Sequence, residues 1–198
     1  MTIVNFPQHG PVAAQMGATP DHDGTDEMDK VASRNSELEQ IFASALTESD
    51  DFRAWLLSRT KFARLWPLVR LMQHEQQAAR GDAPWWRNGP SETRLGAATK
   101  MLLVFEVEQT KLRFALHVET ATDGTTLNAA KDNAYKKFAQ SQLNQPRLFN
   151  YMDFETVLLA PQSLILSDGR ALNFDRRIPF QTIAGFLPQF GGPRLVAA

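Results

Sequence analysis

The sequence contains no cysteine, which excludes disulfide bonds and thiolate metal ligands and fits a reducing compartment. No apolar run approaches the length of about 18 residues that a membrane-spanning helix needs. The N-terminal segment MTIVNFPQHG lacks a basic region followed by an apolar stretch, so we expect no secretory signal and a cytoplasmic location. The formal net charge is only −1, so any contact with nucleic acid must depend on a local basic patch.

The chain does contain enough apolar material for a core, since 43% of its residues are hydrophobic. Residues 1–34 mix proline, glycine, histidine and acids without apolar periodicity, and we expect them to form a flexible tail. Residues 35–198 are sufficient for a single folded domain.

Three helices are expected in the first part of this domain. Ser36 and Glu39 have the spacing of a capping box, and apolar residues follow them at helical intervals. Residues 49–66 predict a second helix, with acids in its first turn. Pro67 is expected to begin a third helix, over residues 67–80.

Strand patterns follow. Two β-rich runs, 100–107 and 111–119, flank a short polar turn and predict a hairpin. The second run alternates apolar and polar residues, so one face should join the core and the other should carry any chemistry. Residues 126–144 predict a helix, and the apolar run 154–161 predicts a buried central strand.

The last part of the chain predicts a strand over 170–178 and a short helix over 179–187. The order of these elements favours an α/β fold, with a mixed sheet flanked by helices and a helical N-terminal part.

Four segments carry a resemblance to a known family: ALHVETA (115–121), KDNAY (131–135), DFETVLLAP (153–161) and FDRRIPFQTIAGFL (174–187). Together they resemble the PD-(D/E)XK nuclease superfamily, which has the restriction-endonuclease-like fold. The match is to a bacterial branch whose third core strand reads ALHIENK or similar and precedes a helix with Gln-x-x-x-Tyr. The resemblance covers roughly residues 35–187.

The resemblance implies hydrolysis of a phosphodiester bond with Mg²⁺, which carboxylates hold and which lowers the pKa of a bound water. Glu119 matches the acid of the third strand, and Glu37 matches an accessory acid on the first helix. The family places a lysine two residues after the strand acid, on the same face, where it stabilises developing charge. This chain has Ala121 there, and Lys100 stands where the family has an aspartate. We therefore expect Mg²⁺ to bind weakly or not at all.

A rearranged site is the alternative to a lost one. Glu92 would then supply the second metal-binding carboxylate beside Glu119, and Lys131 would replace the missing lysine. Residues that could contact nucleic acid are Tyr135, Lys136, Lys137 and Arg176.

Three functions remain open from the sequence. The first is a catalytically degenerate nuclease-fold protein that binds nucleic acid or a protein partner. The second is an active Mg²⁺-dependent DNA or RNA endonuclease with the rearranged site. The third is a structural subunit without nucleic-acid contact.

Overall fold

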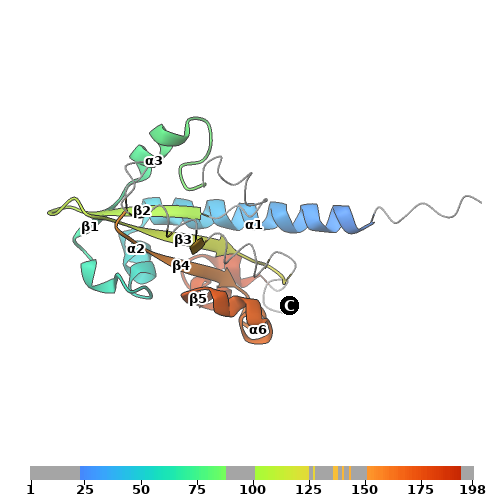
Figure 1. Ribbon diagram of the computed structural model, residues 1–198. Helices are drawn as coiled ribbons and strands as arrows, with labels where there is room; N and C mark the ends of the chain where they lie inside the picture. The colour runs from blue at the N-terminus through green and yellow to red at the C-terminus, as the bar shows by residue number, and fades with distance from the viewer. Residues whose placement is uncertain are drawn as a thin grey trace, which may run out of the picture.

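The computed structural model of the protein describes residues 23–87, 101–124, 127, 136–137, 140, 143 and 151–192, except for the side chains of residues 23–29 and 80. Figure 1 shows a central sheet with the long helix α1 lying across it. Among the described residues, no helix has both the length and the apolar character needed to cross a membrane.

Within the described residues, the sheet has five strands in the order β1-β2-β3-β4-β5. The pairings of β1 with β2 and of β2 with β3 are antiparallel, whereas those of β3 with β4 and of β4 with β5 are parallel. The strands are β1 (Val69–Leu71), β2 (Met101–Val107), β3 (Arg113–Thr120), β4 (Asp153–Ala160) and β5 (Arg176–Pro179). The predicted α/β class, the mixed sheet, the hairpin and the buried strand are confirmed.

The helical elements pack around this sheet (Figure 1). They are α1 (Asp23–Glu48), α2 (Asp50–Leu57), η1 (Ala63–Leu65), α3 (Gln73–Arg80), α6 (Gln162–Ser167), η2 (Gly169–Asn173), α7 (Phe180–Ile183) and η3 (Pro188–Gly191). The predicted helix over 126–144 lies mostly outside the described residues.

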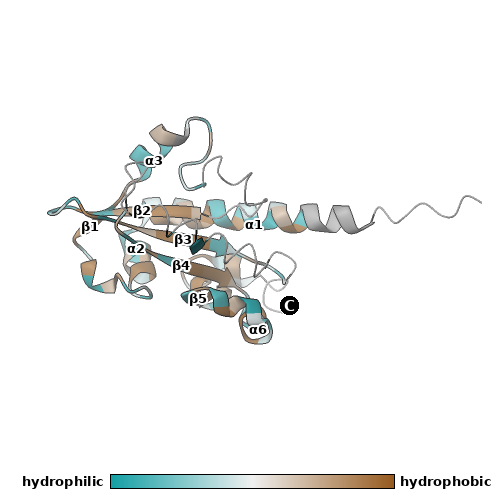
Figure 2. Ribbon diagram, viewed as in Figure 1, coloured by the Kyte–Doolittle hydropathy of each residue, from teal (hydrophilic) through white to brown (hydrophobic). Residues whose placement is uncertain are grey.

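Apolar residues cover both faces of the sheet, and the central strands are correspondingly hydrophobic in Figure 2. On one face, residues of α1, α2 and α7 pack against a cluster that includes Leu116 and Val118 of β3. On the other face, Ala115 belongs to a second cluster and Ala121 to a third. The face of β3 that was expected to carry any chemistry is thus also covered by apolar side chains, and β3 is buried on both faces.

The start of the first helix also differs from the prediction. α1 begins at Asp23, so Ser36 lies inside the helix and does not cap it. No proline and no further glycine interrupts the helix after Gly24, and acids at the beginning of the segment favour the positive end of the helix dipole. Part of the segment expected to be a flexible tail is consequently helical.

Two further predictions are corrected. The segment from Pro67 does not begin a helix, because Val69–Leu71 pair with β2 as an edge strand and α3 starts only at Gln73. The predicted strand over 170–178 begins with the 3-10 helix η2 instead. The Asp168 side chain accepts a hydrogen bond from Arg170 N at 2.9 Å, which stabilises this helical turn.

Candidate functional site

Glu119 lies near the end of β3 and is only 4% exposed. Strand alternation places it with Ala115 and His117, on the face of the sheet opposite α1. A carboxylate at this depth is costly unless other groups compensate its charge. Glu119 is thus a buried acid at the position where the resemblance expects a metal-binding carboxylate.

Ala121 occupies a position that is fully buried, with no exposed surface. Its backbone N–H donates to Leu159 O at 2.9 Å, which continues the ladder between the two strands. Its side chain belongs to an apolar cluster with Leu127, Leu158, Ala160, Leu164, Ala171 and Phe174. The position at which the resemblance expects a lysine is thus part of a hydrophobic cluster.

His117 is buried in an aromatic environment on the same face as Glu119. Its Nε2 lies 3.2 Å from the Tyr151 hydroxyl, and its ring meets Phe154 edge-on with centroids 5.5 Å apart. Burial raises the pKa of Tyr151, so this hydroxyl stays protonated across the physiological range. These contacts give His117 a structural role beside Tyr151.

The other predicted catalytic and metal-binding residues are not brought together with Glu119 in the part of the chain that the structure describes. Glu37 is exposed on α1, which packs on the opposite face of the sheet. Glu92, Lys131 and Tyr135 lie outside the part of the chain that the structure describes. Within that part, no group of three His, Cys, Asp or Glu residues could hold a metal ion.

A second acid on α1 is buried instead of Glu37. Glu39, which the sequence assigned only to a capping box, is 2% exposed. One turn earlier, Asn35 Oδ1 accepts a hydrogen bond from Thr122 N at 3.1 Å. α1 is therefore fixed by a polar contact to the end of β3, next to the segment that carries the family resemblance.

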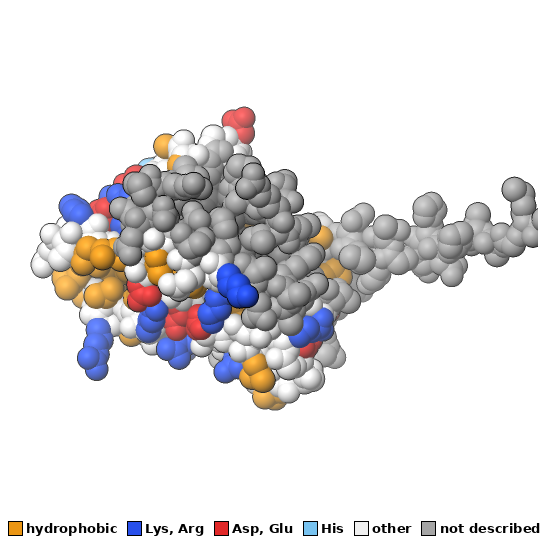
Figure 3. All heavy atoms as spheres, in the orientation of Figure 1, with side chains coloured by type: hydrophobic (Ala, Val, Ile, Leu, Met, Phe, Trp, Pro, Cys, Tyr) orange, Lys and Arg blue, Asp and Glu red, His pale blue; other side chains and the backbone are white. Residues whose placement is uncertain are grey.

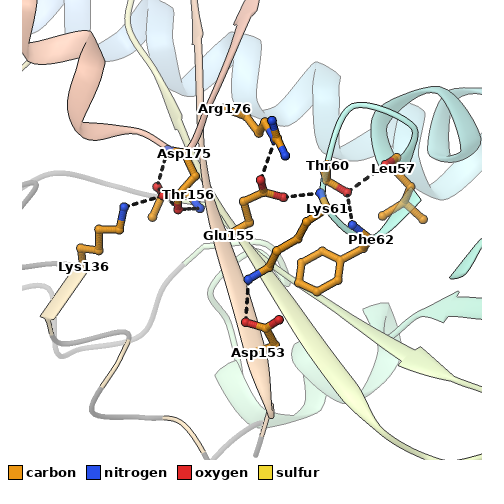
Figure 4. A network of polar contacts seen from close by, with 10 residues as sticks. All are labelled: Leu57, Thr60, Lys61, Phe62, Lys136, Asp153, Glu155, Thr156, Asp175 and Arg176. Carbon is orange, nitrogen blue, oxygen red and sulfur yellow. Dashed lines mark hydrogen bonds and ion pairs between the residues drawn. The ribbon is translucent and has the colours of Figure 1, made fainter. Parts of the chain in front are cut away.

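A polar network that the sequence analysis missed surrounds β4 (Figure 4). Glu155 is 3% exposed, and its carboxylate accepts bonds from Arg176 Nε at 2.6 Å and from the Lys61 backbone N–H at 2.8 Å. Lys61 Nζ lies 2.7 Å from Asp153. Arg176, predicted to contact nucleic acid, therefore also pairs with a buried carboxylate, while its side chain remains 45% exposed.

On the other side of β4, Asp175 and Thr156 bind each other reciprocally. Asp175 Oδ2 accepts from Thr156 N at 2.9 Å and from Thr156 Oγ1 at 2.7 Å, and Asp175 N donates to Thr156 Oγ1 at 3.0 Å. Lys136 Nζ lies 2.5 Å from Asp175 Oδ1. Burial by itself raises the pKa of Asp175, but the bonds from Lys136 and Thr156 outweigh it and leave the pKa below its usual value.

A separate charged cluster surrounds Glu106 on β2. Arg70 on β1 and Arg113 on β3 each place a guanidinium nitrogen 3.1 Å from its carboxylate, which is only 4% exposed. Burial by itself raises the pKa of Glu106, but the hydrogen bonds from Arg113 and Arg70 together outweigh it and leave the pKa below its usual value. This cluster ties three adjacent strands together, and we assign it a structural role.

Cations gather around β4 and β5 from three separate parts of the chain. Lys137 and Arg177 are exposed next to the paired Lys136 and Arg176, and Lys61 approaches from the loop after α2. Figure 3 shows several Lys and Arg side chains, with a few acids between them, on the face of the molecule in view. The sequence carried one signal for this network, since Glu155 is a lone acid in a run predicted to be buried and so requires a partner.

Comparisons of the chain with protein-family models, with curated proteins and with solved structures found no match.

Proposed function

We propose that the protein is a divergent member of the PD-(D/E)XK superfamily that binds nucleic acid without cleaving it. The observation that carries this proposal is the burial of Ala121 in an apolar cluster with Leu158 and Phe174. Catalysis in this family requires an ammonium group beside the strand acid, where it orients water and stabilises charge in the transition state. A methyl group packed in the core cannot supply either effect.

The arrangement of the strands supports the family assignment. The segments ALHVETA and DFETVLLAP, which carry much of the resemblance, lie side by side as parallel strands, with Ala115 opposite Phe154 and Glu119 opposite Leu158. The preceding strand, β2, is antiparallel to β3. We propose on this basis that the sheet is that of a restriction-endonuclease-like fold.

The cations around β4 and β5 support binding of a polyanion. Asp153, Glu155 and Asp175 hold three of the five cations in fixed positions, and the side chains of these three stay 40–45% exposed. Lys137 and Arg177 are also exposed and add two positive charges to this surface. Pre-positioned Lys and Arg side chains are the usual contacts of proteins with phosphate groups.

The proposal is tested with the purified full-length chain and labelled DNA and RNA. We expect binding that weakens steeply with salt, because phosphate contacts release counterions. Replacing Lys137 and Arg177 by alanine should reduce the slope of log K against log salt by about 0.7–0.9 for each phosphate that is no longer neutralised. Absence of binding to any nucleic acid would refute the proposed ligand class, and metal-dependent cleavage would refute the lack of catalysis.

Cleavage would instead support the rearranged site with Glu119 and Lys131. In that case Lys131→Ala should reduce the rate by about 10²–10³-fold, the usual cost of losing a group that stabilises the transition state. Lys137→Ala is the matched control, since it removes the same charge from an exposed position. It should weaken binding and leave the rate at saturating substrate unchanged.

A protein partner is the second candidate function, and one observation favours it. Leu68, Leu112 and Met152 are 45%, 48% and 52% exposed, and they lie at the same end of the sheet. Glu108 N donates to Leu68 O, Val107 N to Leu112 O and Met152 N to Arg113 O. If this surface is the functional one, Leu112→Ser should abolish association with the partner, and nucleic-acid binding should be undetectable.

A further inference from the structure

An arginine on the surface stacks on an aromatic cluster that extends to the core. Phe52 is 1% exposed, and its ring stacks on Trp55 at an interplanar angle of 11° with centroids 5.4 Å apart. The guanidinium carbon of Arg59 lies 4.2 Å from the centre of the Trp55 ring. Arg59 also donates to Trp55 O at 3.2 Å and is exposed, so its planar group is held at the surface.

Phe186 presents a second planar group to solvent beside this stack. Its ring centroid lies 5.3 Å from that of Trp55 and 5.5 Å from that of Phe52, yet Phe186 is 44% exposed. Trp55 therefore connects two exposed planar side chains, one cationic and one aromatic. Such groups are the platforms on which unpaired bases stack in proteins that bind single strands.

Cations continue from this stack toward β5. Lys61 follows Arg59 by two residues in the chain, and its backbone N–H donates to the Glu155 carboxylate, which also binds Arg176 (Figure 4). In the register of the parallel strands β4 and β5, Arg176 lies opposite Val157, which belongs to the core cluster on the α1 face. Arg176 and Glu155 therefore lie on the side of the sheet opposite Glu119. The site is separate from the position at which the resemblance expects the catalytic residues.

We propose that Arg59, Lys61, Arg176 and Phe186 form a binding site for single-stranded nucleic acid. Bases stack on Phe186 and on the Arg59 guanidinium, and the phosphates contact Lys61 and Arg176. A duplex is excluded as the preferred ligand because its bases are stacked on each other and planar side chains cannot reach their faces. This inference rests on the proposed nucleic-acid function and specifies the class of ligand.

Asp153 should oppose binding at this site. Its side chain is 55% exposed and holds Lys61 Nζ at 2.7 Å, so a phosphate must compete with it for the same ammonium. Asp153→Asn removes the negative charge and retains an oxygen that can accept from Phe154 N, as Asp153 Oδ1 does at 2.8 Å. We expect this variant to bind single strands more tightly than the wild type does.

The experiment measures fluorescence anisotropy of a labelled single strand, and of the corresponding duplex, with the full-length chain. Two variants remove one planar group each: Arg59→Lys retains the charge, and Phe186→Leu retains an apolar side chain over Trp55. Each should weaken binding of the single strand by about tenfold, which is within the range measured when one stacking side chain is removed. Lys61→Ala should instead reduce the salt slope by about 0.7.

Arg34→Ala is the matched control. Arg34 is exposed on α1 next to Asn35, which contacts Thr122 just beyond the C-terminal end of β3. Lys61 instead contacts Asp153 at the beginning of β4, which runs parallel to β3. Arg34 therefore lies at the other end of the sheet, and its replacement should change the affinity less than about twofold, well below the effect of one stacking side chain. Thermal melts establish that each variant is folded before affinities are compared.

The outcomes separate this inference from the proposal on which it depends. If the wild type binds and both Arg59→Lys and Phe186→Leu bind equally well, or if duplex binds more tightly, the single-strand site is wrong and nucleic-acid binding stands. If the wild type binds neither form, both proposals are wrong. Single-strand preference that both stacking variants reduce, with Arg34→Ala unaffected, supports the site.

Discussion

Arg176 Nε lies 2.6 Å from Glu155 Oε1, and this pair connects edge strand β5 to the buried part of β4. The Glu155 side chain is almost inaccessible to water, whereas the Arg176 side chain is 45% exposed. The same arginine can therefore stabilise the fold with one nitrogen and present others to a phosphate, since a guanidinium carries five N–H donors.

Removal of this arginine should destabilise the protein. Arg176→Gln leaves the Glu155 carboxylate with only the Lys61 N–H among the bonds shown in Figure 4, so we expect a loss of about 1–3 kcal/mol in the free energy of unfolding. Urea denaturation measures this loss. The double variant with Glu155→Gln no longer buries an uncompensated charge and should be more stable than the sum of the single effects predicts; strictly additive effects would contradict the coupling.

A lysine at position 121, where the resemblance expects one, should damage the fold and create no activity. Ala121→Lys places an ammonium group in an apolar cluster, and the desolvation of such a charge costs several kcal/mol. We expect a loss of about 3 kcal/mol or more in the free energy of unfolding, or an insoluble protein.

Thr122→Lys is the control for this substitution. Thr122 is partly exposed, so a lysine there should change stability by about 0.5 kcal/mol or less. A stable Ala121→Lys variant that cleaves nucleic acid with Mg²⁺ would show that Ala121 faces a usable site.

Stability at acid pH should depend on Asp175. Its pKa is held below the ordinary value of 3.8, so its contribution is fully present above about pH 4 and is lost as the pH falls through the lowered pKa. Asp175→Asn should therefore destabilise the protein at about pH 7 and show a weaker loss of stability between about pH 5 and pH 3 than the wild type.

Lys136→Met tests the partner of this carboxylate. Without the ammonium 2.5 Å away, the pKa of Asp175 should rise toward its usual value, which lowers stability at neutral pH but not once the carboxyl is protonated. Urea midpoints at about pH 7 and pH 3 measure both variants. Equal pH dependence in the wild type and in Asp175→Asn would exclude this carboxyl as a source of acid sensitivity.

Divalent metal should bind weakly or not at all. Under the proposed resemblance, Ala121 and Lys100 stand where a lysine and an aspartate are expected beside Glu119, and Mg²⁺ gives up its hydration water only to sites rich in oxygen ligands. Titration calorimetry with Mn²⁺ measures this directly. Tight binding that Glu119→Gln abolishes would contradict the account.

The central strands could be predicted from the sequence because their signals are local. The hairpin follows from two β-rich runs around a polar turn, and β4 follows from an apolar run of strand length. The edge strand β1 could not, because Val69–Leu71 are short and become a strand only by pairing with β2. The capping-box pattern at Ser36 predicted a helix start at the wrong place, because the helix continues through this pattern from Asp23.

The candidate site was predictable only where a motif marks it. Glu119 and Ala121 were recognised from the third strand, but the burial of both faces of β3 depends on packing between distant segments. The Glu155 network joins β4, β5 and the loop that follows α2. Lys61 in that loop is 94 residues away from Glu155 in the sequence. Arg59 lies outside the segments that carry the resemblance and Phe186 lies near the end of one, but their proximity through Trp55 exists only in the folded chain.

The most direct test of the central claim measures binding and cleavage in the same samples. Labelled single- and double-stranded DNA and RNA are incubated with the full-length chain and Mg²⁺ or Mn²⁺, and both the bound fraction and the product length are determined. We predict that nucleic acid is bound and remains intact at protein concentrations well above the dissociation constant. Metal-dependent shortening of the substrate that Glu119→Gln eliminates would contradict the account and establish the protein as an active nuclease.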